Sequence, residues 1–268
     1  ERARAERGVE HPNLVLAESA HAAFHKAAHY FCVEARKISV RDDWRADVNA
    51  LADAIDDDTV LLVASAPQYP QGVIDPIPEI AALAADRSIS CHVDACMGGF
   101  VLPFKEQLGR HVPPWDFRVA GVTSISADIH KLGYSPKGAS VLVHASAELR
   151  RYQTFVFEDW LGGFYGSPGM LGTKSVAPVA AAWAVMQYLG AEGYRRLVET
   201  TLDGVAKLVE YEKRATEALK KAFWKGPVAT SRHAVFTSPQ SHGAAARMKL
   251  PYVYGHPYCP GHAGPVWY

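Results

Sequence analysis

Short apolar segments alternate with helix-like segments through the first half of the chain. The apolar segments hold several consecutive hydrophobic residues, as in Val-Leu-Leu-Val-Ala, which is typical of strands buried on both faces of a parallel sheet. We expect strands at residues 13–18, 35–40, 59–65, 89–94, 121–126 and 140–144. Apolar residues at helical spacing predict helices at residues 21–31, with Ser19 as a possible N-cap, at 47–55, and ending at residue 85. The sequence therefore predicts an α/β fold, a mostly parallel sheet flanked by helices.

The pattern changes in the second half of the chain. Residues 180–189 have the pattern of a small-residue helix, and residues 194–223 have a long amphipathic pattern rich in Leu, Glu, Lys and Arg. Periodicity then ends and Pro, Gly, His, Ser and Tyr dominate, so we expect a poorly structured or loosely docked tail. The charged, helix-prone start without Met suggests a chain cut from a longer protein. We expect a core at residues 1–190, a connecting helix at 191–225 and an unpatterned tail at 226–268.

Composition narrows the classes of partner. The chain of 268 residues has 28 Lys and Arg against 28 Asp and Glu and no basic stripe, so no nucleic-acid partner is expected. No apolar run is long enough to span a bilayer. The four cysteines, Cys32, Cys91, Cys96 and Cys259, lack the spacing of a disulfide framework. We therefore interpret them as reduced thiols in a cytoplasmic protein.

Two predicted strand ends carry residues that suit pyridoxal 5′-phosphate (PLP) chemistry. The strand at 121–126 leads through Ala-Asp-Ile-His to Lys131, and the strand at 89–94 ends on Asp94. Open α/β sheets bind ligands outside the carboxyl ends of their strands. A lysine amine forms the Schiff base with the PLP aldehyde, and an aspartate keeps the pyridine nitrogen protonated so that the ring acts as an electron sink. The alternatives are a surface lysine and an aspartate that caps the next helix.

Histidines are the next candidates. His21 is flanked by small residues, so its imidazole can stack on an aromatic cofactor; the alternative is a core or capping histidine. His21, His25 and His29 share one helical face, which could suggest a metal site, but no carboxylate or Cys completes the set. The His and Cys residues of segment 256–262 lack a second ligand pair in the same way. We therefore expect no metal.

Polar residues after Lys131 suit a phosphorylated ligand. His130 can donate to a cofactor phosphate, and Lys137 could bind a substrate phosphate or transfer a proton. Tyr134 is a second candidate for proton transfer. Thr173 lies in a stretch bounded by glycines, whose backbone can approach an anion closely. The alternative for Thr173 is a simple surface loop.

Several motifs together resemble a known family. Segments 19–31, 92–95, 121–131, 134–138 and 163–168 closely resemble the sphingosine-1-phosphate lyases in their soluble bacterial form, within the group II decarboxylase family of fold-type I PLP enzymes. The resemblance covers roughly residues 10–215. The Ala-Asp-x-His-Lys block followed by Pro-Lys-Gly is more specific to the lyases than to amino-acid decarboxylases. The fold implied is the large domain of a fold-type I PLP-dependent transferase.

The resemblance implies a role for each cofactor-binding residue. It implies Lys131 as the Schiff-base lysine and Asp94 as the partner of the pyridinium nitrogen. It implies that His21 stacks on the ring and that His130 lies near the cofactor phosphate. Ser126 is expected among the cofactor-binding residues as well.

The resemblance also implies a reaction and an assembly. Family members cleave phosphorylated sphingoid bases, which are amino-alcohol lipids, to a long-chain aldehyde and phosphoethanolamine. Lys137 would be the second active-site lysine, with Tyr134 as a further candidate for proton transfer. Thr173 would reach the cofactor phosphate of the neighbouring subunit, because family members are homodimers with shared active sites.

The chain departs from the family pattern in three places. The phosphate-binding stretch of the Gly-Thr-Glu-Ser type lies upstream of the His21 motif in the family, and this chain starts after it. Residues 226–268 do not resemble the C-terminal small domain, and Lys174 replaces the usual Arg of a Gly-Ser-Arg motif. We therefore expect a lyase core lacking both flanks. Two other functions remain open, a PLP-dependent amino-acid decarboxylase and an inactive truncated homologue that retains only the core fold.

Overall fold

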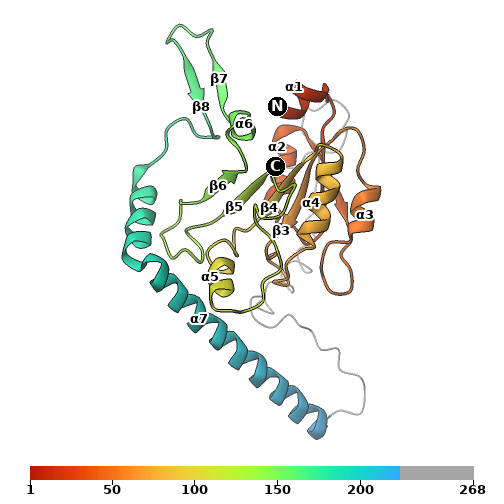
Figure 1. The fold of residues 1–268 in the computed structure, drawn as a ribbon, viewed down its shortest axis with the longest axis vertical. Helices are drawn as coiled ribbons and strands as arrows, with labels where there is room; N and C mark the ends of the chain where they lie inside the picture. Colours follow the sequence, from red (N-terminus) through yellow and green to blue (C-terminus); the bar gives the residue numbers. More distant parts are fainter. Residues whose placement is uncertain (224–268) are drawn as a thin grey trace.

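A six-stranded sheet forms the centre of the molecule (Figure 1). The computed structural model describes residues 1–223, so the tail expected at 226–268 lies outside the described residues. The strands lie in the order β2-β1-β3-β4-β5-β6. Their bounds are β1 Asn13–Ala17, β2 Glu34–Ile38, β3 Thr59–Ser65, β4 Ser90–Asp94, β5 Ser124–Ala127 and β6 Val141–His144. The pairs from β2 to β5 are parallel, and β6 is antiparallel to β5.

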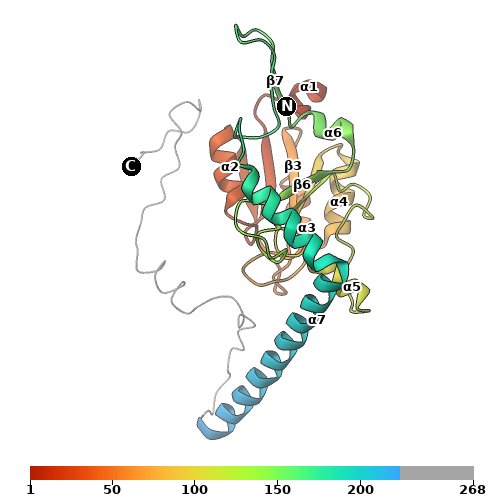
Figure 2. The same ribbon diagram turned by 90° about the vertical axis from the view of Figure 1, so that its left-hand side faces the viewer.

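Helices cover both faces of the sheet, which explains the continuous apolar runs of the strands. Helix α2 (Ala23–Phe31) packs on one face, where Leu14, Leu16 and Val63 are buried. Helices α3 (Val48–Asp53) and α4 (Ile77–Asp86) pack on the other face, and Figure 2 shows α2 and α4 on opposite sides of the strands. The buried residues of this second face form the main core; they include Val15, Leu51, Leu62, Ile77, Ile80 and Val93. The predicted α/β fold with a mostly parallel sheet is confirmed.

The start of α2 differs from the sequence-based expectation. Its N-cap residue is Ala22, which makes no side-chain hydrogen bond, so Ser19 is not the cap. The backbone N–H of Ala23 instead donates to His21 Nδ1 at 3.1 Å, which satisfies one of the free donors of the first helical turn. Ser19 is buried, and its hydroxyl has no hydrogen-bond partner in the described part of the chain. The His21 imidazole therefore accepts the capping hydrogen bond that the sequence pattern assigned to the Ser19 hydroxyl.

The second half of the chain leaves the sheet. After α6 (Ala147–Arg151), strands β7 (Phe155–Phe157) and β8 (Tyr165–Ser167) form an antiparallel hairpin that projects from the body of the molecule (Figure 1). Helix α7 (Val176–Phe223) then runs past the sheet and beyond it. The two helical patterns expected here form one element, with a break at Gly190, where φ is 57° and ψ is −179°. The two remaining helices are α1 (Arg2–Arg7) and α5 (Leu102–Gln107).

The cysteines do not all agree with the prediction. Cys91 and Cys96 are free thiols, and burial raises the pKa of each to about 12. Cys32 is disulfide-bonded, so the expectation of four reduced thiols is wrong at this residue. Among the helices of residues 1–223, none is both long and apolar enough to cross a bilayer.

Candidate active site

The two strand ends predicted to carry the chemistry are adjacent. Strands β4 and β5 are parallel neighbours, and their register pairs Asp94 with Ser126. The Ser126 hydroxyl donates to Asp94 Oδ1 at 3.3 Å. Lys131 follows four residues after the end of β5, so both side chains belong to the carboxyl edge of the sheet. This is the edge at which open α/β sheets bind ligands.

Small residues allow the segment after β4 to approach the ends of β3 and β5. A Cβ atom added at Gly99 would lie 2.5 Å from the Ala127 Cβ atom, and one added at Gly98 would lie 2.0 Å from the Ala66 carbonyl oxygen. Both distances are too short for a side chain. The close approach brings Cys96 to β5, where its carbonyl oxygen accepts the Asp128 backbone N–H at 3.3 Å.

Asp94 is a buried carboxylate, only 9% exposed. Its Oδ1 atom accepts the backbone N–H of Cys96 at 3.0 Å as well as the Ser126 hydroxyl. Within the described residues, no ion pair joins it to a basic side chain. Burying a carboxylate is costly unless charge-assisted hydrogen bonds or a cation compensate. A protonated ring nitrogen would supply the cation that this site lacks.

A chain of hydrogen bonds leads to Asp94 from the buried His92. His92 Nδ1 lies 2.8 Å from the Ser124 hydroxyl, and His92 Nε2 lies 3.1 Å from the Ser126 hydroxyl. Because Ser126 donates to Asp94, it can accept from Nε2–H, and Ser124 then donates to Nδ1. Burial lowers the pKa of His92 to about 4, although the Asp94 charge opposes this, so the imidazole is neutral at pH 7. The chain therefore directs one hydroxyl donor at the Asp94 carboxylate.

Lys131 is paired with a carboxylate that the sequence interpretation did not assign. Its Nζ atom donates to Asp128 Oδ2 at 2.8 Å, and its side chain is 31% exposed. Burial acts to lower the pKa of Lys131, but the hydrogen bond to Asp128 and the charges of Asp128 and Asp94 raise it above its ordinary value. The Ser140 hydroxyl donates to the other oxygen of Asp128.

His130 has one nitrogen engaged with the backbone. Its Nδ1 atom lies 2.6 Å from the Ala139 carbonyl oxygen, which can only accept, so Nδ1 carries a proton. The His130 Nε2 atom lies 3.6 Å from Asp128 Oδ2. Nε2 is therefore the nitrogen that the predicted phosphate contact would use, and it faces the Asp128 carboxylate in this structure.

The loop after Lys131 is fixed at several points. Its backbone N–H groups at Tyr134 and Ser135 donate to the carbonyl oxygens of Lys131 and Ile129, each at 3.1 Å. Tyr134 has a φ of 61° and is exposed, as is Lys137. Both side chains are therefore accessible to a substrate at this edge.

The other two predicted residues, His21 and Thr173, are exposed and make no hydrogen bond to Lys131 or Asp94 within the described residues. His21 is exposed on the segment between β1 and α2. Three residues later, the Phe24 ring lies 5.8 Å from the His92 ring, so this segment covers the face of β4 that carries His92 and Asp94. Thr173 is exposed between β8 and α7, and no hydrogen bond within residues 1–215 joins it to Lys131 or Asp94. The structure thus brings together Lys131, Asp94, Ser126 and His130, but not Thr173.

Sequence reasoning missed the polar residues that support the strand ends. Asp128, Ser140, His92 and Ser124 received no role, although Asp128 is part of the Ala-Asp-x-His-Lys block. The alternation of Ser124 and Ser126 on one face of β5, opposite His92 and Asp94, was the available signal.

The possible histidine metal site has no complete ligand set. No group of three or more His, Cys, Asp or Glu side chains able to hold a metal ion occurs in the described part of the chain. This includes His21, His25 and His29. Segment 256–262 lies outside the described residues.

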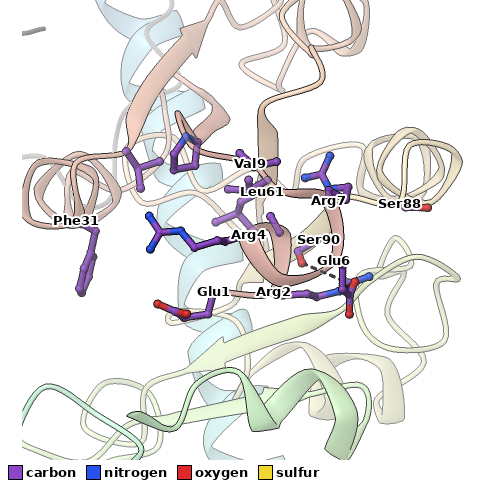
Figure 3. Close-up of a pocket in the computed structure, with 14 residues that line it drawn as sticks. Glu1, Arg2, Arg4, Glu6, Arg7, Val9, Phe31, Leu61, Ser88 and Ser90 are labelled. Carbon is purple, nitrogen blue, oxygen red and sulfur yellow. Dashed lines mark hydrogen bonds and ion pairs between the residues drawn. The ribbon is translucent and has the colours of Figure 1, made fainter. Parts of the chain in front are cut away.

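A cavity of about 570 Å³ lies at the opposite edge of the sheet (Figure 3). Helix α1 and the amino ends of β3 and β4 line it, and Arg4, Phe31 and Leu61 are among the lining residues. Arg2 donates to the Ser90 hydroxyl across it at 3.4 Å. None of the predicted site residues lines this cavity, so it is separate from the candidate active site.

Comparison with known proteins gives consistent matches. The family model for the pyridoxal-dependent decarboxylase conserved domain matches residues 2–221. Sphingosine-1-phosphate lyase 1 of Rattus norvegicus is 47% identical over 222 residues, which are 82% of this chain and 38% of that protein. The sphingosine-1-phosphate lyase of Arabidopsis thaliana is 43% identical over 215 residues, 80% of this chain and 38% of that protein.

Solved structures agree with the sequence matches. The structure of the Burkholderia pseudomallei sphingosine-1-phosphate lyase has a TM-score of 0.72 and 48% identity, and the match covers 74% of this chain and 46% of that chain. A glutamate decarboxylase of Lactobacillus brevis has a TM-score of 0.66 at 24% identity, which is evidence for the fold alone. The chain spans about two-fifths of the length of the curated relatives it matches.

Proposed function

Because the chain belongs to the pyridoxal-dependent decarboxylase family, as its motifs predicted, we propose that it forms the PLP-binding core of a carbon–carbon lyase acting on phosphorylated sphingoid bases. The 48% identity with a sphingosine-1-phosphate lyase structure carries this proposal. The products would be a long-chain aldehyde and phosphoethanolamine. Residues 1–190 would form the core and residues 191–225 the connecting helix.

The residues at the carboxyl edge fit PLP. Asp94 is a buried carboxylate that no basic side chain of the described chain pairs with, which suits a protonated pyridine nitrogen. Lys131 supplies a primary amine at the neighbouring strand end. His130 Nε2 would contact the phosphate, and Ser126 holds Asp94 in place. The buried, unpartnered Ser19 hydroxyl adds a free donor at the same edge.

Each of these residues would have a distinct task in the reaction. Lys131 would hold the cofactor covalently through Nζ, Asp94 would bind its ring nitrogen, and the His21 imidazole would stack on its ring. When bound, PLP supplies an electron sink for the pair released as the C2–C3 bond of the substrate breaks. Tyr134 and Lys137 are the candidates to take the proton from the 3-hydroxyl group and to return a proton to C2.

Lys137 supports a phosphorylated substrate over a free amino acid. It is exposed on the loop after Lys131, where an ammonium group can meet a phosphate. The loop approaches the start of α7, since a Cβ atom added at Gly138 would lie 2.9 Å from Pro178. A cation on a loop held in this way suits recognition of a phosphate headgroup.

A homodimer with shared active sites is part of the same proposal. The β7–β8 hairpin and the first part of α7 expose large apolar side chains, an unusual amount for a monomer. They include Phe155, Phe157, Trp160, Leu161, Phe164, Trp183 and Tyr188. Thr173 lies between these two exposed surfaces, where a second copy could bring it to the partner's cofactor. Analytical ultracentrifugation of the wild type and of Trp183→Glu tests this, and a monomeric wild type contradicts it.

A product assay tests the proposed reaction. We expect the chain, incubated with PLP and sphingosine 1-phosphate, to release a fatty aldehyde, and Lys131→Ala to release none. Carbon dioxide from free amino acids would instead indicate a decarboxylase. A PLP titration without saturable binding would indicate an inactive homologue.

We also propose that the protein acts in the cytoplasm. The free thiols of Cys91 and Cys96 support a reducing compartment. The disulfide at Cys32 is the observation that opposes this location, and thiol labelling directly after lysis checks whether it is present in the cell. A Cys32 that resists labelling until a reductant is added contradicts the location.

A further inference from the structure

Asp128 occupies a central position at the end of β5. Its carboxylate is buried, with Oδ2 at 2.8 Å from Lys131 Nζ and the other oxygen bonded to the Ser140 hydroxyl. Its backbone N–H donates to Cys96 of the segment that follows β4. Asp128 is therefore held by the segments next to β4 and β6, and its side chain is less exposed than that of Lys131, 11% against 31%.

The carboxylates around Lys131 favour its ammonium form. Asp128 pairs with Lys131 from the same loop and also has His130 Nε2 at 3.6 Å, while Asp94 and Cys96 lie across from Lys131 at the end of β4. Burial raises the pKa of Cys96 to about 12, so this thiol is uncharged at neutral pH. Although burial acts against the charged form, the pKa of Lys131 is raised, and the hydrogen bonds from Lys131 and Ser140 outweigh burial and lower the pKa of Asp128. The pair is an ion pair at neutral pH.

An ammonium cannot attack a carbonyl carbon, whereas covalent attachment of PLP needs the free amine. The ammonium must first lose a proton to solvent. The neutral nitrogen then adds to the aldehyde carbon, a C=N bond forms, and one water leaves. The Asp128 ion pair opposes the first of these steps, because it stabilises the ammonium form of Lys131.

We propose that Asp128 is a positioning residue that holds Lys131 Nζ at the end of β5 in the cofactor-free chain, and that this ion pair must open before PLP is captured. The inference rests on the proposed function, since it concerns the same lysine. It assigns to Asp128 a task in cofactor loading, and makes Ser140 the residue that orients the carboxylate.

The reactivity of Lys131 in the cofactor-free chain tests this directly. The full chain is treated with limiting acetic anhydride across a pH series, and acetylation of Lys131 and Lys137 is measured by mass spectrometry. We expect Asp128→Asn to raise labelling of Lys131 about tenfold at pH 8, and to lower its half-reaction pH by about one unit, because the counter-ion is gone. Labelling of Lys137 serves as the internal reference and should not change.

Two controls separate charge from structure. Asp86→Asn removes an exposed carboxylate at the end of α4, and should leave both lysines as in the wild type. Asp128→Glu keeps the charge and should restore much of the protection of Lys131. Equal labelling of Lys131 in the wild type and in Asp128→Asn overturns the inference.

A measurement on the wild type alone covers the case in which Asp128→Asn fails to fold. The half-reaction pH is the pH at which acetylation of a lysine reaches half of its maximum. It should be higher for Lys131 than for Lys137, and the reverse order overturns the inference. Neither readout depends on turnover. A missing aldehyde product with protected Lys131 would reject the proposed function alone, whereas normal product with unprotected Lys131 would reject the role of Asp128 alone.

Discussion

The Tyr194 hydroxyl of α7 donates a hydrogen bond to the Gly133 carbonyl oxygen, 2.8 Å away and two residues beyond Lys131. Tyr194 is buried, and its ring stacks on Phe104 of α5 at a centroid distance of 5.5 Å. Since Tyr194 follows the break at Gly190, the second part of α7 is attached to the loop that carries the lysine. A helix distant in sequence therefore fixes the position of the candidate catalytic loop.

Removing this hydrogen bond should cost stability. We expect Tyr194→Phe to lower the free energy of unfolding by about 0.5–1.5 kcal/mol, because the ring keeps its packing while the Gly133 carbonyl loses its donor. Urea unfolding followed by circular dichroism measures this. Tyr188→Phe, at an exposed position of the same helix, is the matched control and should have no effect. An equal loss in both variants contradicts the assignment.

Substitution of Lys131 and of Lys137 should cause different defects, the first in cofactor attachment and the second in turnover or substrate binding. Lys131→Ala should abolish the covalent PLP adduct that borohydride reduction traps, because the amine is missing. Lys137→Ala should keep the adduct but lower turnover by about 10²-fold if the lysine transfers a proton, or raise KM if it only holds the substrate phosphate. Mass spectrometry of the reduced peptide and steady-state kinetics distinguish these outcomes. Wild-type behaviour of Lys137→Ala would make the Pro-Lys-Gly loop a surface turn and remove the main argument for a phosphorylated substrate.

Ser126 links two buried groups, so its loss should affect ligand binding more than folding. Ser126→Ala removes a donor from Asp94 and the acceptor of His92 Nε2. A hydrogen bond to a charged group contributes roughly 1.5–3 kcal/mol, so we expect PLP affinity to fall about tenfold or more. A fluorescence titration measures this. Ser124→Ala, which leaves the Asp94 contacts intact, should have a smaller effect, and the reverse order would contradict the chain of donors.

Burial of neutral His92 predicts loss of stability in acid. The pKa of His92 is lowered by burial to about 4 in the folded chain, whereas an unfolded histidine has a value near 6.5. The unfolded state therefore binds more protons below pH 6.5, and the folded state loses stability as pH falls toward 4. Near pH 4.5, His92 should account for on the order of 2 kcal/mol of this loss. Unfolding free energies of the wild type and of His92→Gln across this range should differ in slope, and His111→Gln, at an exposed position, should match the wild type.

Two glycines of α7 should respond with opposite sign to the same substitution. Gly190 has a φ of 57° and a ψ of −179°, which is strained for any residue with a Cβ atom, so Gly190→Ala should destabilise by about 1–3 kcal/mol. Gly204 lies in the regular helix, and a Cβ atom there would meet no atom within 4 Å. Gly204→Ala should therefore stabilise by roughly 0.5–1 kcal/mol. Thermal unfolding of both variants measures this, and a neutral Gly190→Ala would mean that the helix straightens without cost.

The strands could be predicted from the sequence because a strand buried on both faces of a sheet is a continuous run of apolar residues. The continuous run of residues 59–65 coincides with β3, and the parallel order followed from the intervening helices. Adjacency of Asp94 and Lys131 followed in turn, since the ends of neighbouring parallel strands share one edge. The pattern could not reveal which of the two groups at the start of α2 would accept the Ala23 N–H. Ser19 has the better capping chemistry, but its side chain is buried in the fold.

The pairing of Lys131 with Asp128 was unpredictable for a related reason. Both residues lie in a connection, where no periodicity fixes the direction of a side chain. The three-residue strands β7 and β8 are also too short to show a countable alternation. Such features depend on contacts between segments and leave no local pattern.

Because β6 runs antiparallel to β5, the position of Lys131 and the reach of the loop around Lys137 depend on different parts of one connection. The segment from Asp128 to Ser140 leaves β5 and enters the antiparallel β6 at the same edge of the sheet. The outer part of this segment, around Lys137, is exposed, so we expect insertions or deletions there to change its reach with little effect on either strand. Lys131 stays next to Asp128 at the fixed end. Under the proposed roles of Lys131 and Lys137, substrate range could be redesigned by exchanging this short loop tip without changing the residue that attaches the cofactor.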